Sequence, residues 1–317
     1  MILLSFVIPC YRSELTIERV YQEIKDVVSE RDNFDYEIIA VNDCSPDGVL
    51  GILKKIAELD KKMKVIDLAK NFGKHSAVMA GYEFARGDYI VNLDDDYQCP
   101  VNELWKLVDP LIEENYDCAV ALYEKKQEKL WKRVGSAVNA AMVRVMLEQP
   151  QEITFDNFYV FKRFIRDEIL RYKNPYPYIS GLILRSTHNI KIVPMQERER
   201  GDGNETGFTF RKSVNLLLNG LTSFSVKPLR VATMIGFFMA LVGFFFTVFV
   251  VIKKIRNPLV TMGYSSLMAV ILFSTGMIMI MLGLIGEYIG RIFISLNNSP
   301  QYVIKEVFNL HTDGSET

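Results

Sequence analysis

A run of three aspartates followed by a glutamine is the part of this sequence best equipped for chemistry. It occupies residues 92–98 (NLDDDYQ), at the end of an apolar stretch. In an extended backbone residues i and i+2 point the same way, so Asp94 and Asp96 should face one ligand, joined by Gln98 if the extension persists. Two carboxylates and an amide oxygen suit Mg²⁺ or Mn²⁺, which completes its coordination with phosphate oxygens and water. Such a cation would neutralise the charge that builds on a departing diphosphate.

Polar clusters also follow two earlier apolar stretches. The residues PCYR (9–12) end one of them, and NDCSPDG (42–48) follows another. Turn formation alone explains SPDG at 45–48 well, but it explains three consecutive aspartates poorly. If the stretches are parallel strands, their carboxyl ends meet at one edge of a sheet, where ligands of such sheets bind.

The elements that must position these residues alternate along the first 125 residues. Apolar runs typical of buried strands fall at 3–9, 36–41, 65–68, 89–93 and 118–122, and apolar residues recur at helical spacing between them, as at Ile17, Val20, Ile24 and Val27. Strands that are apolar on both faces and separated by helices predict a covered parallel sheet, and therefore an α/β fold. The chain of 317 residues is long enough for one such domain plus an appendage.

Two long apolar segments predict that this appendage is a membrane hairpin. Residues 231–252 and 262–286 contain no charged residue, and as helices they would span roughly 33–38 Å against a hydrocarbon core of ~30 Å. A hairpin buried in a soluble core is the weaker interpretation, because helices apolar all round and of this length rarely fit a domain of this size. Glycines at 236, 243, 276, 283 and 286 would allow close helix contact.

Two spans would return the chain to its starting side, so the sequence predicts a multi-pass protein of the inner or plasma membrane. The catalytic part is expected in the cytosol, because Met1 leads directly into an apolar run without a basic region or a small-residue cleavage site. Basic residues flank the segments on that side, although the connector at 253–258 is basic as well. We predict domains at 1–209 (catalytic), 210–229 (an interfacial amphipathic helix), 230–291 (two membrane helices) and 292–317 (a cytosolic tail). Apolar stripes within 131–145 and 210–224 suit partial immersion in a bilayer, or ordinary core packing.

Composition excludes some other roles. The net charge is −1 and no basic stripe is present, so no nucleic acid partner is expected. The four cysteines, Cys10, Cys44, Cys99 and Cys118, are irregularly spaced without a CxxC pair. Reduced thiols of a cytosolic domain are therefore expected.

Six motifs in order make the chain similar to a known group of enzymes. They are VIPCYRSE (7–14), VNDCSPD (41–47), NFGK (71–74) with 77–81, DDDYQ (94–98), FSVKPL (224–229) and IGEYIGR (285–291). The chain resembles the membrane-bound polyprenyl-phosphate glycosyltransferases of the second glycosyltransferase family, which include dolichyl-phosphate mannose synthase and undecaprenyl-phosphate glucosyl- and aminoarabinosyltransferases. The resemblance implies a GT-A (Rossmann-like) nucleotide-sugar domain, followed by interfacial helices and a two-helix transmembrane hairpin. The chain differs from the family pattern at Asn42, which replaces an acid, and at Glu197, where a histidine is common.

The resemblance also assigns roles to individual residues. Asp43 would hydrogen-bond the base, Pro9 and Tyr11 would line the base and ribose pocket, and Lys74 would touch a phosphate or the sugar. The implied nucleotide-binding set is Pro9, Tyr11, Glu14, Asp43, Lys74 and Asp94, the implied metal set is Asp94, Asp96 and Gln98, and the implied catalytic residues are Asp95, Asp96 and Arg200. Relatives assemble as tetramers through their membrane helices, so a homo-oligomer is expected. A UDP-sugar is favoured as the donor by resemblance to the bacterial branch.

The acceptor is expected to be a polyprenyl phosphate such as undecaprenyl phosphate. A monophosphate has a second pKa near 6, so it is largely dianionic at neutral pH and can attack an anomeric carbon without a general base. The protein must instead hold two anions together, which calls for arginines and hydrogen-bond donors. The candidates for the acceptor phosphate are Arg133, Ser136, Arg198 and Arg200. Attack in line on an α-linked donor would invert the anomeric centre.

Two other functions remain open from the sequence. A hydroxyl acceptor, such as a glycan or a lipid, would need a general base, and Asp95 or Asp156 could serve. A catalytically silent membrane scaffold is the other alternative, against which the complete set of Asp94, Asp96 and Gln98 argues.

Overall fold

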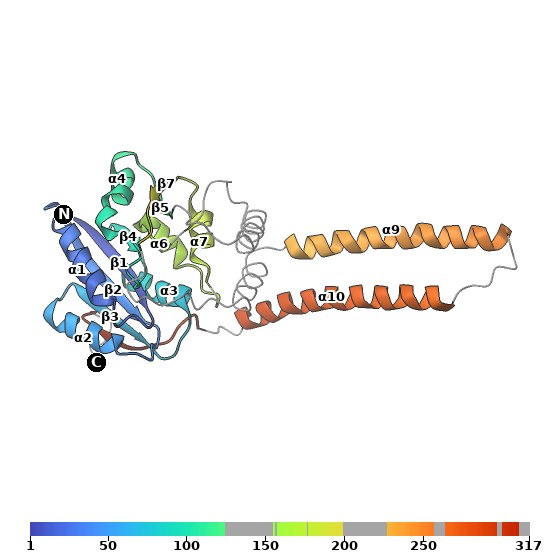
Figure 1. Cartoon of the computed structure of the whole chain (residues 1–317), viewed down its shortest axis with the longest axis horizontal. Helices are drawn as coiled ribbons and strands as arrows, with labels where there is room; N and C mark the ends of the chain where they lie inside the picture. The colour runs from blue at the N-terminus through green and yellow to red at the C-terminus, as the bar shows by residue number, and fades with distance from the viewer. Residues whose placement is uncertain are drawn as a thin grey trace. The chain divides into compact units, whose positions relative to one another are not determined.

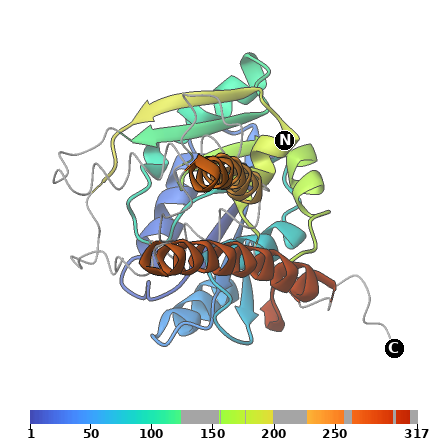
Figure 2. The ribbon, with the colours of Figure 1, turned by 90° about the vertical axis from the view of Figure 1, so that its right-hand side faces the viewer.

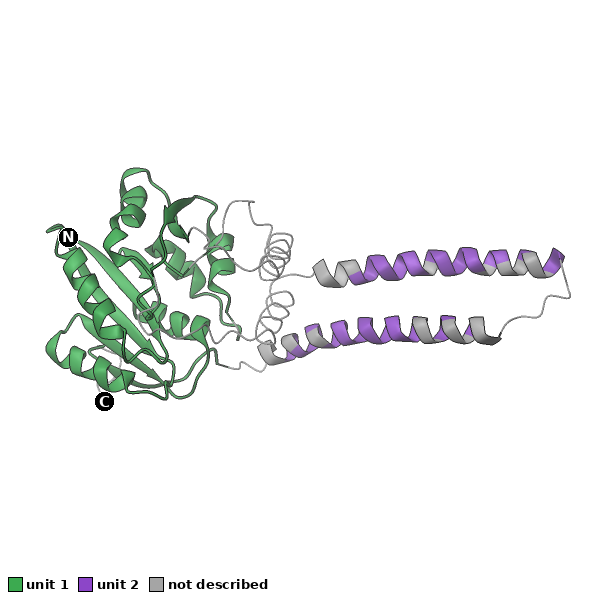
Figure 3. Ribbon diagram, viewed as in Figure 1, with its two compact units in different colours: residues 1–140, 149–208, 299–317 green, residues 141–148, 209–298 purple. Residues whose placement is uncertain are grey.

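The computed structural model describes residues 1–123, 155, 157–175, 177–198, 227–256, 264–296 and 300–310. The chain divides into two compact units. The first contains residues 1–140, 149–208 and 299–317, and the second contains residues 141–148 and 209–298 (Figure 3). The first unit is therefore discontinuous in sequence, because the second unit is inserted ahead of its last segment.

A mixed sheet forms the centre of the first unit. In the described residues it has eight strands in the order β7-β5-β6-β4-β1-β2-β3-β8. Strands β1, β2, β3 and β4 run parallel, as do β5 and β7, which lie side by side in Figure 2, whereas β6 and β8 run antiparallel to their neighbours. The strands are β1 (Ile2–Cys10), β2 (Phe34–Asn42), β3 (Met63–Leu68), β4 (Tyr89–Asn92), β5 (Cys118–Tyr123), β6 (Tyr159–Lys162), β7 (Ile190–Met195) and β8 (Ile304–Phe308).

Helices cover both faces of this sheet (Figure 1). One core contains apolar side chains of α1 (Ile17–Val28), α2 (Val49–Leu59) and α4 (Trp105–Glu113), which follows a short 3₁₀ turn at Val101–Glu103. The other contains side chains of α3 (Lys74–Phe84), α6 (Arg163–Ile169) and α7 (Ile179–Ser186). The predicted α/β fold with a covered sheet is confirmed, and so are the five predicted strands. Strands β1 to β4 are largely buried on both faces, which is why their sequences are mostly apolar.

The C-terminal segment departs from the prediction. Residues 292–317 were expected to form a tail, but Ile304–Phe308 joins the sheet as β8 against β3. The side chain of Asn309, just after β8, donates from Nδ2 to the carbonyl oxygens of Ala57 at 2.5 Å and Met63 at 2.9 Å. Asn309 has a φ of +55°, a conformation that asparagine tolerates better than most residues. The chain thus returns to the catalytic unit after the hairpin and completes its sheet.

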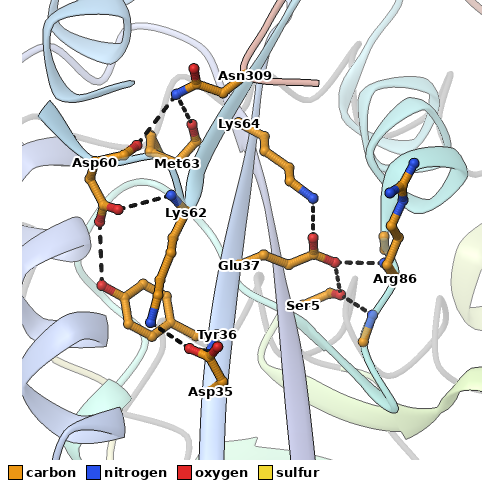
Figure 4. A network of polar contacts seen from close by, with 12 residues as sticks. Ser5, Asp35, Tyr36, Glu37, Asp60, Lys62, Met63, Lys64, Arg86 and Asn309 are labelled. Atoms are coloured by element: carbon orange, nitrogen blue, oxygen red, sulfur yellow. Dashed lines mark hydrogen bonds and ion pairs between the residues drawn. The ribbon is translucent and has the colours of Figure 1, made fainter. Parts of the chain in front are cut away.

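A buried carboxylate ties together the middle of the sheet (Figure 4). Glu37 on β2 accepts from Ser5 Oγ at 2.5 Å and from the Arg86 N–H at 2.6 Å, and it forms an ion pair with Lys64. The Gly87 N–H in turn donates to Ser5 Oγ at 2.7 Å. These contacts fix the entry of β4 against β1 and β2, and so set the position of the aspartate run at the other end of β4.

The second unit contains two long helices, α9 (Lys227–Arg256) and α10 (Tyr264–Leu296). They contact each other, and a Cβ added at Gly236 would lie 3.0 Å from Met281 Cε. Added Cβ atoms at Gly243, Gly276, Gly283 and Gly286 would meet nothing within 4 Å among the described residues. Among the described residues, no helix is both long enough and apolar enough to cross a membrane. The helical hairpin is present as predicted, and its two membrane spans stay a prediction.

The predicted interfacial stretches are not part of this description. Residues 131–145 and 210–224 lie outside the described residues, as does most of the predicted interfacial helix at 210–229.

The close approach at Gly87 gives a test of the packing at the entry of β4. A Cβ there would lie 2.6 Å from Ser5 Oγ, 2.7 Å from Ser5 N and 2.8 Å from Leu3 O. Because two of these atoms are backbone, Gly87→Ala should lower the free energy of unfolding by about 2–3 kcal/mol. The measurement is thermal unfolding of detergent-purified protein.

Gly51→Ala is the matched control. Gly51 is exposed on helix α2, and an added Cβ meets nothing within 4 Å among the described residues. This substitution should stabilise the protein by up to about 1 kcal/mol, since alanine favours helix over glycine. Similar shifts for the two variants would contradict the packing described for Gly87.

Candidate active site

The loops after β1 and β2 are locked together by three hydrogen bonds. The Arg12 N–H donates to Ser45 Oγ at 2.8 Å, and the Glu14 N–H donates to Asp47 Oδ2 at 3.0 Å. In the opposite direction the Gly48 N–H donates to Glu14 Oε2 at 2.8 Å. Glu14 therefore braces the turn that follows β2. Its predicted role in nucleotide binding would act through the shape of this loop.

Tyr11 joins this pair of loops to the aspartate run. Its backbone N–H donates to Asp95 Oδ2 at 2.9 Å, while its side chain is 43% exposed. The Arg12 guanidinium lies 5.5 Å from the centre of the Tyr11 ring. Pro9 is buried within β1 just before this loop. An exposed aromatic ring at the end of a central strand is suited to stacking against a base.

Asp43 is buried at the end of β2 and faces the loop that precedes α3. Its carboxylate oxygens accept from the N–H groups of Phe72 at 2.7 Å and Gly73 at 2.9 Å. Burial raises the pKa of Asp43, and the two backbone donors partly oppose this rise. Each oxygen has a second lone pair, so Asp43 can hold this loop and still accept from a base.

The aspartate run bends where the sequence predicts extension. Strand β4 ends at Asn92, and Tyr97 has a φ of +67°, so the backbone does not stay extended as far as Gln98. The Gln98 N–H turns back to Asp96 Oδ1 at 3.1 Å. The condition on which Gln98 was expected to join the two aspartates, a backbone that stays extended, is therefore not met, although the bend still keeps Gln98 next to Asp96.

Asp95 points away from its two neighbours and into the loop after β1. In addition to the bond from Tyr11, its carbonyl oxygen accepts from Thr16 Oγ1 at 2.5 Å. Burial raises the pKa of the Asp95 carboxyl to about 7, and the charges of Asp94 and Asp96 add to the effect. Asp95 is therefore partly protonated near neutral pH. This geometry favours a structural contribution of Asp95, and its predicted catalytic role remains a prediction.

Lys74 lies against the first aspartate of the run. Its Nζ forms a 2.5 Å ion pair with Asp94 Oδ1, which links the start of α3 to the end of β4. The Asp94 side chain is 16% exposed and that of Lys74 is 39% exposed, so both groups can be reached by solvent. A phosphate that binds here would meet Lys74 directly, as predicted for a residue that touches the donor.

A divalent metal has a suitable, though small, set of ligands at this bend. Asp94 and Asp96 supply carboxylates, and Gln98 supplies an amide oxygen. In the described part of the chain no three His, Cys, Asp or Glu side chains gather as a metal site. Mg²⁺ commonly takes one or two protein carboxylates and fills its remaining positions with phosphate oxygens and water. The hard oxygen donors present fit that limited requirement.

A second segment packs against the bend through Gln98. Its Nε2 donates to Glu197 Oε1 at 3.0 Å, and the Arg198 N–H donates to the Gln98 carbonyl oxygen at 3.1 Å. The bond to Glu197 orients the Gln98 amide, because it fixes which atom is the donor. Residues 197–198 thus approach the aspartate run closely, although about a hundred residues separate them in sequence.

The Arg198 guanidinium makes several contacts with other parts of the protein. Its guanidinium donates to both carboxylate oxygens of Glu23 on α1, at 2.7 and 2.8 Å, and contacts Asn102. It also lies 5.0 Å from the centre of the Tyr97 ring. The hydrogen bonds with Glu23 raise the pKa of Arg198. These contacts indicate that Arg198 positions the segment beside the bend, and its predicted role as an acceptor-phosphate ligand stays a prediction. Arg133, Ser136, Asp156 and Arg200 lie outside the described residues.

Sequence reasoning missed three residues that belong to this site. Glu23 pairs with Arg198, and Glu197 orients Gln98; neither carries a local signal, because each partner is distant in sequence. His75 follows Lys74 at the start of α3, and its ring lies 5.6 Å from that of Tyr178, edge to face. Burial lowers the pKa of His75 to about 4, helped by the charge of Lys74. His75 is therefore neutral at physiological pH.

More than half of the chain, including the strands and loops of this site, matches the model of a known family. The model of glycosyl transferase family 2 matches residues 5–180 of the chain. This chain belongs to glycosyl transferase family 2. A second model, the GtrB C-terminal hairpin, matches residues 227–292, which include α9 and nearly all of α10. The family assignment made from six sequence motifs is thereby confirmed, and the chain is a glycosyltransferase.

Named relatives cover almost the whole chain. An undecaprenyl-phosphate 4-deoxy-4-formamido-L-arabinose transferase of Pseudomonas savastanoi pv. phaseolicola (strain 1448A / Race 6) is 30% identical, over 96% of this chain and 90% of the relative. A prophage bactoprenol glucosyl transferase homolog of Escherichia coli (strain K12) is also 30% identical, over 96% of this chain and 99% of the relative. The family 2 domain and the hairpin therefore occur together in these relatives at full length.

Solved structures support the fold of the first unit. Glucosyl-3-phosphoglycerate synthase of Mycobacterium tuberculosis, crystallised with Mn²⁺, UDP and glucosyl-3-phosphoglycerate, superposes with a TM-score of 0.53. The sequence identity is 19%, and the match covers 71% of this chain and 80% of the other. At this identity the comparison shows the fold alone, which confirms the predicted GT-A class.

The pair Glu23–Arg198 gives a test of the positioning role. If Arg198 holds the segment at 197–198 against the metal bend, Arg198→Met and Glu23→Gln should each lower turnover by about tenfold, from the roughly 1.5 kcal/mol of a charged hydrogen-bonded pair. The double variant should be little worse than either one, because both remove the same interaction. Steady-state kinetics with varied acceptor would provide these values.

A direct role of Arg198 on the acceptor makes a different prediction. In that case Arg198→Met would raise the acceptor KM, while Glu23→Gln would leave it near the wild-type value. Arg31→Met is the matched control. Arg31 lies just beyond the end of α1 and, like Arg198, donates two hydrogen bonds to one carboxylate, that of Asp109. That variant should keep wild-type kinetics.

Proposed function

We propose that the enzyme transfers a sugar from a nucleotide-sugar, in the first instance a UDP-sugar, to a polyprenyl phosphate such as undecaprenyl phosphate. The anomeric centre is inverted in this reaction, and the lipid phosphate is the nucleophile. The names of two full-length relatives, an undecaprenyl-phosphate sugar transferase and a bactoprenol glucosyl transferase, support the acceptor class. The UDP complex of the superposed synthase supports the donor class.

The observation that carries this proposal is the meeting of Lys74, Asp94 and Asp43 at one edge of the sheet. Asp43 is buried at 3% exposure and faces the loop that precedes α3, whereas the side chains of Lys74 and Asp94 are partly exposed to solvent. A base edge would bind at Asp43 and a diphosphate at Lys74. A divalent cation held by Asp94 and Asp96, with Gln98, would stabilise the departing diphosphate when bound.

No residue needs to act as a general base with this acceptor. The second pKa of a monophosphate is near 6, so its oxygens are already charged at neutral pH. The protein must supply cations that hold the acceptor near the donor. Arg133, Ser136 and Arg200 remain our candidates, and Arg198 is expected to position the segment that leads into Arg200.

A hydroxyl acceptor is the second candidate, and one observation favours it. A carboxyl with a pKa of about 7 is well matched to general-base catalysis near neutral pH, and Asp95 has such a value. Asp95 Oδ2, however, already accepts the Tyr11 N–H at 2.9 Å. The acceptor preference of the purified enzyme distinguishes the two candidates.

We further propose that the α9–α10 hairpin inserts in the inner or plasma membrane, with the catalytic unit in the cytosol. Residues 231–252 and 262–286 carry no charge. Large apolar side chains on both helices are exposed in the single chain, including Phe237 at 68%, Phe245 at 66%, Ile280 at 69% and Phe293 at 64%. Such surfaces need a bilayer or a partner. A Cβ added at Gly276 or Gly283 would meet nothing within 4 Å among the described residues, which is consistent with a homo-oligomer, proposed as a tetramer by family resemblance.

Cell fractionation tests the membrane proposal. The full chain should remain in the membrane pellet after a carbonate wash at high pH, and detergent should release it as an oligomer by light scattering. A protein that stays in the supernatant before any detergent is added would refute insertion, and a monomer in mild detergent would refute the oligomer.

The reaction is tested by transfer of radiolabel into the organic phase. Detergent-purified enzyme is given undecaprenyl phosphate, Mg²⁺ or Mn²⁺ and a panel of UDP- and GDP-sugars. One UDP-sugar should label the lipid, EDTA should abolish the labelling, and Asp96→Ala should reduce it by about a hundredfold or more, as expected when a ligand of a catalytic cation is lost.

Two other results would decide against the proposal. Donor hydrolysis without lipid labelling, or labelling of diacylglycerol or undecaprenol in place of the phosphate, would select the hydroxyl-acceptor alternative. Full activity of Asp96→Ala would refute the metal assignment. Asp60→Ala is a suitable control for a carboxylate outside the site, because Asp60 contacts Tyr21 and Lys62 in the turn between α2 and β3.

A further inference from the structure

The last strand of the sheet contains a bulge opposite the end of β3. Asp67 on β3 pairs with Glu306 on β8, but the next residue, Leu68, pairs with Ile304. Lys305 is therefore an extra residue, and two residues of β8 oppose Asp67 alone. Bulges of this kind redirect side chains near functional sites.

The bulge changes the side of the sheet that Lys305 faces. Ile304 and Val307 both pack against the core under α3 and α6, so the two residues between them are displaced toward the opposite face. Asp67 lies on that opposite face, because it shares a face with Val65, two residues earlier, and Val65 belongs to the core under α1 and α2. Lys305 Nζ consequently lies 3.5 Å from Asp67 Oδ2. A regular strand would direct Lys305 to the other side.

Asp67 also connects Lys305 to the turn after β2. It is buried at 3% exposure, and Asp67 Oδ1 accepts from Asn42 Nδ2 at 2.7 Å. The other end of the same amide, Asn42 Oδ1, accepts from the Ser45 N–H at 3.2 Å. Ser45 Oγ receives the Arg12 N–H from the loop after β1. A continuous chain of contacts thus runs from β8 to the loop after β2, which contains Asp43, and on to the loop after β1.

The turn needs this support. Cys44, which lies between Asp43 and Ser45, has a φ of +50°, a strained conformation for a residue with a side chain. The Asn42–Ser45 bond closes the turn across Cys44, and the Asn42 amide is oriented by Asp67. A buried carboxylate is stable only when donors or cations satisfy it, and Lys305 supplies positive charge on the side away from Asn42.

We propose that Lys305 and Asp67 are positioning residues for the nucleotide donor. They orient Asn42, which fixes the turn at 42–48 in the shape that presents Asp43 to the base. The turn that presents Asp43 is therefore supported by Lys305, which follows the hairpin in sequence and lies nine residues after α10 ends at Leu296. This inference rests on the proposed use of a nucleotide-sugar.

The test is titration calorimetry of the full-length, detergent-purified protein with UDP and Mn²⁺. This readout needs neither the sugar nor the acceptor. Lys305→Met keeps the aliphatic stem and removes the charge, and it should weaken UDP binding by about fivefold, equivalent to roughly 1 kcal/mol. Lys305→Arg should restore binding to within about twofold, because it restores the charge.

Lys54→Met, a change on α2 that removes an ion pair to the same strand, is the matched control. Lys54 Nζ forms a 3.0 Å ion pair with the side chain of Glu306, the neighbour of Lys305 in the bulge, whereas the side-chain contacts that lead to Asn42 pass through Lys305 and Asp67. Lys54→Met should bind UDP like the wild type. Because the Lys305 side chain is 66% exposed, Lys305→Met should also melt within a few degrees of the wild type without UDP.

The outcomes separate this inference from the proposed function. Wild-type protein that does not bind UDP would refute the proposed donor and the inference together. Wild-type binding with unchanged binding by Lys305→Met would overturn the inference alone. Equal weakening in Lys305→Met and Lys54→Met would also overturn it, because the effect would then come from a loosened strand.

Discussion

At the carboxyl edge of the sheet, two aspartate carboxylates accept hydrogen bonds from the backbone of another loop. Asp43 holds the loop ahead of α3 through Phe72 and Gly73, and Asp95 holds the loop after β1 through Tyr11. Because an unsatisfied buried carboxylate is costly, these bonds fix the loops to one another before any ligand arrives. The acidic groups that would bind the donor are therefore also the groups that build its pocket.

Much of the fold follows from local patterns, and much of the site does not. The strands at the centre are mostly apolar on both faces, so β1 to β5 are evident from the sequence, while β6, β7 and β8 depend on neighbours far along the chain. Asp94 and Asp96 are recognisable as potential ligands by their type and position. The bend at Tyr97 is not, because its positive φ is set by tertiary contacts. Nothing near Arg198 indicates that Glu23, 175 residues away, would occupy it.

The asparagine at position 42 departs from the acid expected by family resemblance, and its surroundings explain why an amide suits this chain. Asn42 is 2% exposed and faces the buried carboxylate of Asp67. A second carboxylate there would place two like charges together away from solvent, which raises the pKa of one of them and removes a donor. An amide can donate to Asp67 and accept from Ser45 at the same time. The departure is thus a local adjustment around Asp67, and it leaves Asp43 in place.

The pairing of β3 with β8 has a consequence for how the nascent chain matures. Strand β3 ends at Leu68 and its partner begins at Ile304, so the edge of β3 stays unpaired until the more than two hundred residues between them have been synthesised. At roughly 5–20 residues per second this interval lasts on the order of ten to fifty seconds, during which an open strand edge is prone to wrong pairing. The sheet can be closed only after α9 and α10 have been synthesised. The catalytic unit is begun first and completed last, so a ribosome that stalls within the hairpin releases an unfinished enzyme.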